Sequence, residues 1–284
     1  MLISRLPQPA LRPFVKRLWV AVPATGQPAV TGAREHVLPT GGMHLVFRLS
    51  DAPLRLFQCP DDPIGRVLGH AVVGGARSTF YVRDVSTPSS SVGAQLYPGA
   101  AQVLFGITAD ALSERHTRLE DLWGPAAAVA RERLLEADGP ERKLALFETL
   151  LLARFPPTHG LHPAVAHAIQ RLAETNNVHE VVKQSGYSHR HFIALFRRAV
   201  GLSPKTYGRL LRFQKALECV AHVAHVADVD MRGTISWADL ALDCGYSDQA
   251  HFNREFREFT GVTPENYREI SPVFAHHLSI DLIQ

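Results

Sequence analysis

The sequence predicts an α+β protein with an N-terminal β-barrel domain and a C-terminal all-α domain. Residues 1 to about 99 contain short apolar runs separated by turn-forming residues, and helical periodicity begins only after Pro98-Gly99. Further along the chain, the stretch at residues 186–207 returns with an offset of sixty, so that Phe192 recurs as Phe252 and Tyr207 as Tyr267. A repeat with one constant offset indicates a supersecondary unit that was built twice.

The first part of the chain carries six runs of strand length. They lie at residues 15–22, 44–49, 54–57, 67–73, 79–85 and 92–96. Turn signals such as Pro39 to Gly42 and Gly74-Gly75 separate them, and this spacing is typical of a small barrel or sandwich. Helical patterns follow at residues 101–105, 109–115, 125–136 and 141–155.

A segment rich in proline and glycine ends the last of these helices. Residues 155–163 read FPPTHGLHP, and adjacent prolines cannot continue a helix. We therefore expect a first domain at residues 1–155, a linker at 156–162, a second domain at 163–270 and a tail at 271–284. A chain of 284 residues has room for two such domains, each with its own core.

Composition limits the classes of protein. The formal net charge of +3 is too small for a globally basic coat. The three cysteines, Cys59, Cys219 and Cys244, lack C-x-x-C spacing, which argues against structural zinc and favours a reducing compartment. No run approaches the roughly 18 apolar residues that a membrane span needs, so we expect a cytoplasmic protein without a membrane partner.

Each copy of the repeat has the pattern of a helix-turn-helix. A short helix precedes a turn at Gly186 or Gly245, a second helix follows, and a Gly-x-Ser/Thr-Pro sequence ends it. Ser188 and Asp248 each lie four residues before the aligned phenylalanine, where they suit the N-cap of the second helix. A helix-turn-helix lays this second helix in the major groove of DNA.

Helical periodicity gives the second helix of each copy a buried face and an outward face. With Phe192 in the core, a rotation of about 100° per residue places Leu195, Phe196 and Ala199 on the same side. The candidate DNA-binding residues lie on the outward face or at its edge: His189, Arg190, Ile193 and Arg197 in the first copy, and Gln249, Asn253, Arg254 and Arg257 in the second. Arg, Asn and Gln are the usual readers of base edges. Two copies in register favour this interpretation over that of plain solvated helix faces.

Basic residues gather around the first copy. Residues 181–217 contain no acid and eight basic residues: Lys183, Arg190, Arg197, Arg198, Lys205, Arg209, Arg212 and Lys215. Such a block attracts phosphate and makes binding dependent on salt. The second copy also carries acidic residues, so we expect a weaker electrostatic contribution from it.

The second half of the chain resembles the DNA-binding domain of the AraC/XylS family of bacterial transcription regulators. The resemblance covers roughly residues 163–270, and ALDCGYSDQAHFNREFREFTGVTPENYR in the second copy is its more specific part. It implies two helix-turn-helix units that are joined by a long helix and read successive major-groove segments on one DNA face. In the first copy Ala194 stands where the family often has the arginine that Arg254 supplies in the second, which puts base reading by the first copy in question.

The first half resembles, more loosely, the N-terminal sensing domain of one branch of the same family. The motifs that carry this likeness are REHVLPTGGMHLVF at residues 34–47 and LYPGAAQVLFGITADAL with EDLWG, which ends at Gly124. The likeness implies a cupin-like barrel followed by a helical pair used for dimerisation. It names no ligand.

No pattern in the first domain indicates catalysis, a metal or a cofactor. His36, His44 and His70 lie on expected strands, but they form no H-x-H motif and no i, i+4 pair. A P-loop, a dinucleotide fingerprint and an HExxH motif are absent from the sequence. The expectation is therefore an apolar pocket for a small effector, or an interior filled by side chains.

An insertion separates the two copies. The family commonly has about fifty residues between its motifs, and the surplus falls around residues 221–234. Residues 228–239, DVDMRGTISWAD, resemble an EF-hand calcium loop, but Arg232 stands where an oxygen ligand belongs. The simpler interpretation, which we favour, is that Ser236 caps the next helix with Asp239 at its third position, after an ordinary turn.

The expected function is a sequence-specific transcription regulator that binds double-stranded DNA, forms a homodimer and responds to a small-molecule effector, with RNA polymerase as a further candidate partner. In a first alternative, the N-terminal domain serves only dimerisation or protein contact. A second alternative is an enzyme domain fused to DNA-binding helices, as in alkyl-transfer repair. Against it, no cysteine has the histidine neighbourhood that such chemistry needs.

Overall fold

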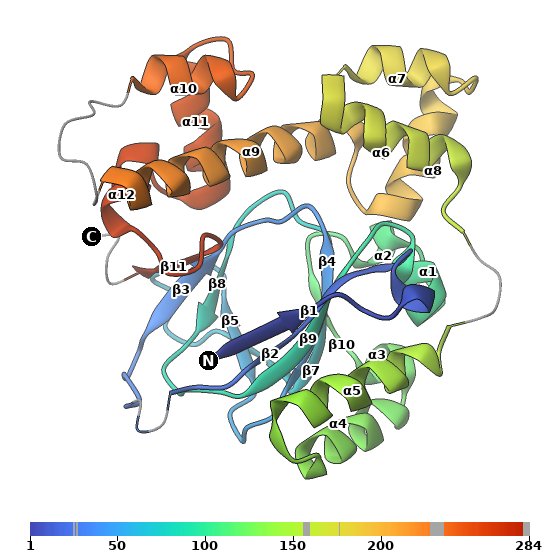
Figure 1. The fold of residues 1–284 in the computed structure, drawn as a ribbon, viewed down its shortest axis with the longest axis vertical. Helices are drawn as coiled ribbons and strands as arrows, with labels where there is room; N and C mark the ends of the chain where they lie inside the picture. Colours follow the sequence, from blue (N-terminus) through green and yellow to red (C-terminus); the bar gives the residue numbers. More distant parts are fainter. Residues whose placement is uncertain (25, 27, 156–159, 176, 228–235, 281–284) are drawn as a thin grey trace.

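The computed structural model describes residues 1–24, 26, 28–155, 160–175, 177–227 and 236–280. It confirms the α+β class: two antiparallel sheets with five helices form one half of the molecule, here the β half, and seven helices form the helical half (Figure 1). Within the described residues, none of the helices combines the length and the apolar character that a membrane crossing requires.

Two sheets face each other in the β half. The six-stranded sheet has the order β1 (Leu2–Arg5), β2 (Val15–Ala21), β9 (Ser91–Leu96), β4 (Met43–Arg48), β7 (Ala71–Gly74) and β10 (His116–Arg118). The five-stranded sheet has the order β11 (His277–Ser279), β3 (Arg34–Val37), β8 (Tyr81–Asp84), β5 (Leu54–Phe57) and β6 (Arg66–Gly69). The run expected as one strand at residues 67–73 is two strands, because the chain turns at Gly69 with a φ of +102°. His70 therefore lies between strands, whereas His36 and His44 lie on β3 and β4.

Helices close one face of the six-stranded sheet. After α1 (Ala100–Phe105), α2 (Ala109–Leu112) and α3 (Glu120–Trp123), the longer α4 (Ala126–Glu136) and α5 (Gly139–Leu152) pack on this sheet (Figure 1). Phe47 of β4 meets Phe147 of α5 edge to face, with ring centroids 5.8 Å apart. Met43, Leu45 and Phe47 thus point to the helices, and the residues between them point to the other sheet.

The helical half consists of two small units on one long helix. The first unit contains α7 (Val178–Gln184) and α8 (His189–Val200), and the second contains α10 (Trp237–Asp243) and α11 (Gln249–Thr260). The long helix α9 (Pro204–Ala227) joins them, while α6 (Pro163–Thr175) and α12 (Pro264–Ile270) pack on it. Figure 1 shows the units at opposite ends of α9, and α9 crossing above the sheets.

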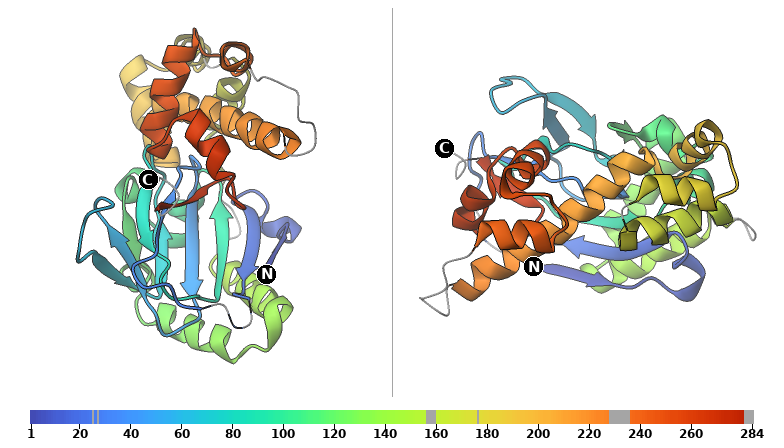
Figure 2. Two further views of the ribbon diagram at one scale, coloured as in Figure 1. Left: turned by 90° about the vertical axis from the view of Figure 1, so that its left-hand side faces the viewer. Right: turned by 90° about the horizontal axis from the view of Figure 1, so that it is seen from above.

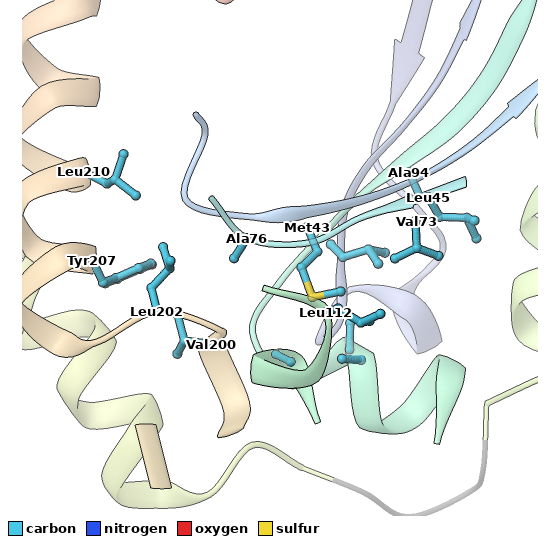
Figure 3. Packing of buried hydrophobic residues seen from close by; sticks show 14 of the residues in the cluster. Met43, Leu45, Val73, Ala76, Ala94, Leu112, Val200, Leu202, Tyr207 and Leu210 are labelled. Carbon is cyan, nitrogen blue, oxygen red and sulfur yellow. The ribbon is translucent and has the colours of Figure 1, made fainter. Parts of the chain in front are cut away.

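The two halves share one apolar core. Figure 3 shows Leu45 and Val73 of the sheet continuing through Met43, Ala76 and Leu112 to four buried residues of the helical half: Val200, Leu202, Tyr207 and Leu210. Gly201 ends α8 in a left-handed conformation, and a Cβ there would lie 3.2 Å from the Cβ of Ala76. The first unit is therefore packed against the β half.

The C-terminal tail carries a strand that was not expected from the sequence. Strand β11 pairs antiparallel with β3, with Leu278 opposite His36 (Figures 1 and 2). His276 also contacts Gln214 of α9, with 2.7 Å between Nε2 and Oε1, and Gln214 Nε2 donates to the carbonyl of Pro39 at 2.6 Å. The tail thus joins the five-stranded sheet to the long helix.

The insertion lies partly outside the described residues. Residues 228–235, which hold most of the calcium-like stretch, are among those without a described placement. Ser236 caps α10 as expected, because its hydroxyl accepts a hydrogen bond from the amide of Asp239 at 3.2 Å. Helix α9 continues into the insertion as far as Ala227.

Candidate nucleic-acid interface

The second helix of each unit begins at the expected cap. Ser188 accepts a hydrogen bond from the amide of His191 at 3.4 Å, and Asp248 accepts one from the amide of His251 at 2.7 Å. The latter bond lowers the pKa of Asp248, because it favours the ionised carboxylate. A glycine with positive φ follows each helix. Helices α8 and α11 therefore have matching lengths and ends.

Aromatic residues fix which face of each helix is buried. Phe192 and Phe196 of α8 are fully buried, as are Phe252 and Phe256 of α11. Leu195 and Ala199 are half-buried on the same side, in agreement with the helical count. This leaves the opposite face of each helix free of core contacts.

The candidate residues lie where the helical count places them. Six are exposed in the full chain, namely His189, Arg190, Arg197, Gln249, Arg254 and Arg257, whereas Ile193 and Asn253 are half-buried. In the second unit, Asn253, Arg254 and Arg257 line an open hollow of about 570 Å³ together with Glu258 and Thr263. Four of the eight candidate residues lie on α8 and four on α11. These helices lie at opposite ends of α9, so the candidate residues form two separate patches (Figure 1).

A buried carboxylate anchors the second of these helices. Glu255 is only 3 % exposed and lies on the inner side of α11. Arg212 of α9 approaches it with Nη2 2.8 Å from Oε1, and Arg209 Nε lies 2.7 Å from Oε2. Arg209 also reaches Glu258 at 2.6 Å. The network joins the connecting helix α9 to α11.

These salt bridges correct the expected electrostatics. Arg209 and Arg212 were counted among eight basic residues available to phosphate, but both are paired with glutamates of α11. Lys215 donates to the carbonyl of Asp243 at 2.6 Å. Five of the eight are exposed and have neither a salt bridge nor a side-chain hydrogen bond among the described residues: Lys183, Arg190, Arg197, Arg198 and Lys205. The positive surface is therefore concentrated on the first unit and on Lys205.

The sequence analysis did not identify Glu255 as a buried anchor, although the repeat places it at a buried position. The sixty-residue offset aligns Glu255 with Leu195, which the helical count places on the buried side. A carboxylate at such a position needs a cationic partner, because an unpaired buried charge is costly. The arginines that pair with it, Arg209 and Arg212, precede it by 46 and 43 residues, so the partner was not evident from local spacing.

A second hollow lies between the two units. It measures about 340 Å³ and is lined by residues of α7, α9 and α11: Val178, Lys205, Arg209, Arg212, His251 and Glu255. Lys205 is its one exposed cation without a salt bridge among the described residues. A DNA backbone that passes from one unit to the other would meet this lysine.

Comparison with known proteins gives a family match in each half of the chain. Residues 181–270 match a family described as a helix-turn-helix domain, and residues 4–118 match a domain of unknown function (DUF6597). ToxT from Vibrio cholerae superposes with a TM-score of 0.43 at 8% identity, over 94% of this chain and 98% of ToxT. A Haemophilus influenzae protein described as an uncharacterized HTH-type transcriptional regulator is 23% identical over 109 residues, 38% of this chain, and the chain covers 33% of that protein.

The relative that decides the family is the regulatory protein SoxS of Salmonella typhimurium. It is 33% identical over 93 residues, which make up 32% of this chain and 77% of SoxS. SoxS of Escherichia coli is 30% identical over 105 residues, 37% of this chain and 88% of SoxS. Together with the paired helix-turn-helix units on one connecting helix, these matches show that the chain belongs to the AraC/XylS family of transcription regulators.

Proposed function

We propose that the protein binds DNA sequence-specifically through α8 and α11 and that a small-molecule effector held in the β half controls this binding. The observation that supports the DNA-binding part best is the pair of capped helices whose outward polar faces stay exposed although the β half packs against α8 and α9. Two such helices on one rigid connector suit two successive major-groove segments.

The two helices have unequal roles in this proposal. Arg254 and Asn253 of α11 read base edges, because arginine and asparagine form bidentate hydrogen bonds with guanine and adenine. Arg190 and Arg197 of α8 contact phosphates and position the protein, since the first unit has Ala194 at the place that corresponds to Arg254. His189, Ile193, Gln249 and Arg257 complete the two contact surfaces.

Selection from random DNA tests the proposal directly. The purified full chain would be used to enrich binding sites from a random duplex pool, followed by affinity measurements on the enriched site and on a scrambled duplex. We expect one enriched site with two half-elements about one helical turn apart, and specific binding at least about 10³-fold tighter than binding to the scrambled duplex. Enrichment of no site would contradict sequence-specific binding.

A second candidate function uses the β half only for association. Helix α4 exposes Val129 and Leu135, at 53% and 42%, and such apolar side chains suit a homodimer contact or a contact with RNA polymerase. In this case the regulator has no effector. Light scattering of the full chain, combined with melting temperatures measured in a metabolite collection, separates the two candidates.

We propose no enzymatic role for the protein, and we place it in the cytoplasm, where its DNA target is. The alternative of an alkyl-transfer enzyme needs a reactive thiolate. Burial, together with the neighbouring Cys219, raises the pKa of the Cys244 thiol to about 12, so this thiol stays protonated at neutral pH. Cys59 is exposed on the surface of the β half.

A further inference from the structure

The glycines that end α8 and α11 both lie against the β half. Gly201 and Gly261 are sixty residues apart, so they are equivalent positions of the repeat, and both have positive φ, at +90° and +84°. A Cβ at Gly201 would lie 3.2 Å from the Cβ of Ala76, and one at Gly261 would lie 3.0 Å from Cε1 of His36 and 3.1 Å from Cζ of Phe80. Each unit therefore contacts the β half at the same point, the C-terminal end of its second helix.

The two contact points belong to different sheets. Ala76 follows β7 of the six-stranded sheet, whereas His36 lies on β3 of the five-stranded sheet. The separation of these points depends on how the two sheets face each other. The connecting helix α9, with 24 residues, fixes its two ends only as far as it stays straight, and long helices curve. Contacts of both units with the β half add a second constraint.

The first contact is apolar and continues into the shared core. Val200 and Leu202, on either side of Gly201, are buried, and Figure 3 shows both in the cluster that extends into the β half. The amide of Gly99 also donates a hydrogen bond to the carbonyl of Ala199 at 2.9 Å. Opening this contact would expose apolar side chains to water, so α8 stays attached to the β half.

The second contact is centred on one buried histidine. The ring of His36 stacks on Phe80 with centroids 4.1 Å apart, and its Nδ1 lies 3.1 Å from the carbonyl oxygen of Thr260, the last residue of α11. Because a carbonyl only accepts, Nδ1 carries the proton of the ring, which is neutral at pH 7 since burial lowers its pKa. The last carbonyls of a helix have no partner within the helix, and His36 supplies one. The end of α11 is therefore held by a hydrogen bond as well as by packing.

The C-terminal tail joins the strand that carries His36 to the helical half. Leu278 of β11 lies opposite His36 and is fully buried. The hydroxyl of Tyr267 on α12 donates to the carbonyl of Ala275 at 2.8 Å. Because α12 packs on α9 and β11 pairs with β3, the tail ties the second unit to the five-stranded sheet beside the His36 contact (Figure 2).

We propose that the β half fixes the distance and the angle between α8 and α11, with His36 as the positioning residue of α11 and the tail, residues 271–280, as the latch that keeps this contact closed. The proposal rests on the proposed function, in which these two helices read successive segments of DNA. A shared apolar core holds α8, whereas one histidine and the tail hold the end of α11. The network of Glu255 keeps α11 on α9, so loss of the His36 contact loosens the second unit without unfolding it.

Duplexes with altered spacing test this positioning. The enriched site is varied by up to about two base pairs between its half-elements, and each base pair moves the second half-element by about 3.4 Å and turns it by about 35°. Fluorescence anisotropy should show that the full chain loses at least about 30-fold in affinity when the spacing changes by about two base pairs. His36→Ala should bind the original spacing about tenfold more weakly and lose less than about threefold on the altered spacing, because its α11 is free to follow the half-element.

Two variants serve as controls for His36→Ala. His36→Asn places an amide donor near the position of Nδ1 and should restore the spacing dependence of the unchanged chain. His70→Ala removes a similar hydrogen bond within the β half, from Nε2 of His70 to the carbonyl of Asp51 at 3.1 Å, and should leave the spacing dependence as it is. If His36→Ala does not fold, His36→Phe takes its place, because it keeps a ring beside Phe80 but cannot donate.

The latch is tested by two aspartates in the tail. Leu278→Asp places a carboxylate at a fully buried position and should release β11, whereas Val273 is 89% exposed, so Val273→Asp should not. Amide hydrogen exchange is measured without DNA. In Leu278→Asp and in His36→Ala, the last turn of α11 should exchange at least about tenfold faster, and the last turn of α8 should keep its rate.

Unchanged exchange at the end of α11, or an unchanged spacing dependence in both His36→Ala and Leu278→Asp, would show that α9 alone sets the separation. A full chain that binds all spacings equally would also overturn the proposal, although sequence-specific binding would stand. If no site is enriched from random DNA, the proposed function fails, and hydrogen exchange then decides alone whether His36 and the tail hold α11.

Discussion

Nη2 of Arg212 lies 2.8 Å from Oε1 of Glu255, and this contact joins the connecting helix α9 to the buried side of α11, the proposed base-reading helix. Arg209 occupies the other carboxylate oxygen at 2.7 Å. The orientation of α11 about its own axis is set by this network as well as by Phe252 and Phe256. Because Arg254 directly precedes Glu255, any rotation of the anchored carboxylate also turns the proposed base-reading side chain.

Removal of this anchor should destabilise the second unit. Glu255→Ala leaves Arg209 and Arg212 without their shared partner in a half-buried site, and we expect a loss of about 3 kcal/mol in the free energy of unfolding, measured by urea denaturation. Glu258→Ala is the matched control, because Glu258 is 49% exposed and its pair with Arg209 should contribute less than about 1 kcal/mol. Equal losses in both variants would show that burial of Glu255 has no energetic consequence.

Base reading and phosphate contact can be separated by two arginine variants. Arg254→Ala should cost about 1–3 kcal/mol on the enriched site and relax the base preference at one position. Arg197→Ala should weaken specific and random DNA to a similar degree, as loss of a phosphate contact does. Fluorescence anisotropy on both duplexes measures this. If Arg254→Ala lowers both affinities equally, the assignment of α11 as the reading helix is wrong.

Salt dependence reports on the exposed cations of the first unit. Binding of the full chain to DNA should weaken steeply with salt, and Lys205→Ala should reduce the slope of log affinity against log salt by about 0.9, the value for one phosphate contact. Lys205 lies in the hollow between the units, whereas Lys143 lies on α5 of the β half. Lys143→Ala should leave the slope unchanged. If Lys205→Ala leaves the slope unchanged, DNA does not contact the hollow between the two units.

The sequence contains enough to predict the helical half but not how it packs on the β half. Local sequence spacing predicts the caps, the buried phenylalanines and the outward residues of α8 and α11. The repeat shows the same spacing in both copies. Strand β11 does not, because His277–Ser279 is too short for an alternating pattern and becomes a strand only by pairing with β3, far away in sequence. The cross-strand neighbours of His44, Gln95 on β9 and Gly74 on β7, were equally hidden, since they depend on strand register rather than on spacing along the chain.

Acid should weaken the docked tail. Burial, followed by the charges of His277 and Lys16, lowers the pKa of His276 to about 4, from about 6.5 in an unfolded chain. Between these values the unfolded state binds the extra proton and the folded state does not, so the free energy of unfolding decreases as pH falls from about 6.5 to 4. The expected loss from this residue is about 3 kcal/mol at 1.36 kcal/mol per pKa unit.

Urea denaturation at pH 7 and at pH 4.5 measures most of this loss, which His276→Gln should reduce while the exposed His179→Gln should not. His44 should also lower the free energy of unfolding in acid, because burial lowers its pKa to about 4 as well. Some acid sensitivity should therefore persist in His276→Gln. An unchanged pH dependence in that variant would show that the tail does not hold a neutral, buried His276.

The insertion between the two units should project from the helical half without setting their spacing. The contacts that fix the second unit on α9 come from Arg209, Arg212, Phe213 and Lys215, and Val220 is the last buried residue among those of this helix whose side chains are described. Residues 221–227 add about two helical turns beyond these contacts. The added length therefore lies past the second unit rather than between the two units.

Replacing residues 226–232 by a short Gly-Ser link should accordingly leave DNA affinity within about tenfold, or roughly 1.4 kcal/mol. Anisotropy on the enriched site measures the affinity, and circular dichroism verifies the fold of the shortened chain. Calcium should change the melting temperature of neither protein, because Arg232 replaces an oxygen ligand and Ser236 already caps α10. Complete loss of binding by a folded shortened chain would show that the insertion sets the distance between the reading helices, and a calcium-dependent rise in melting temperature would show that residues 228–239 bind the ion.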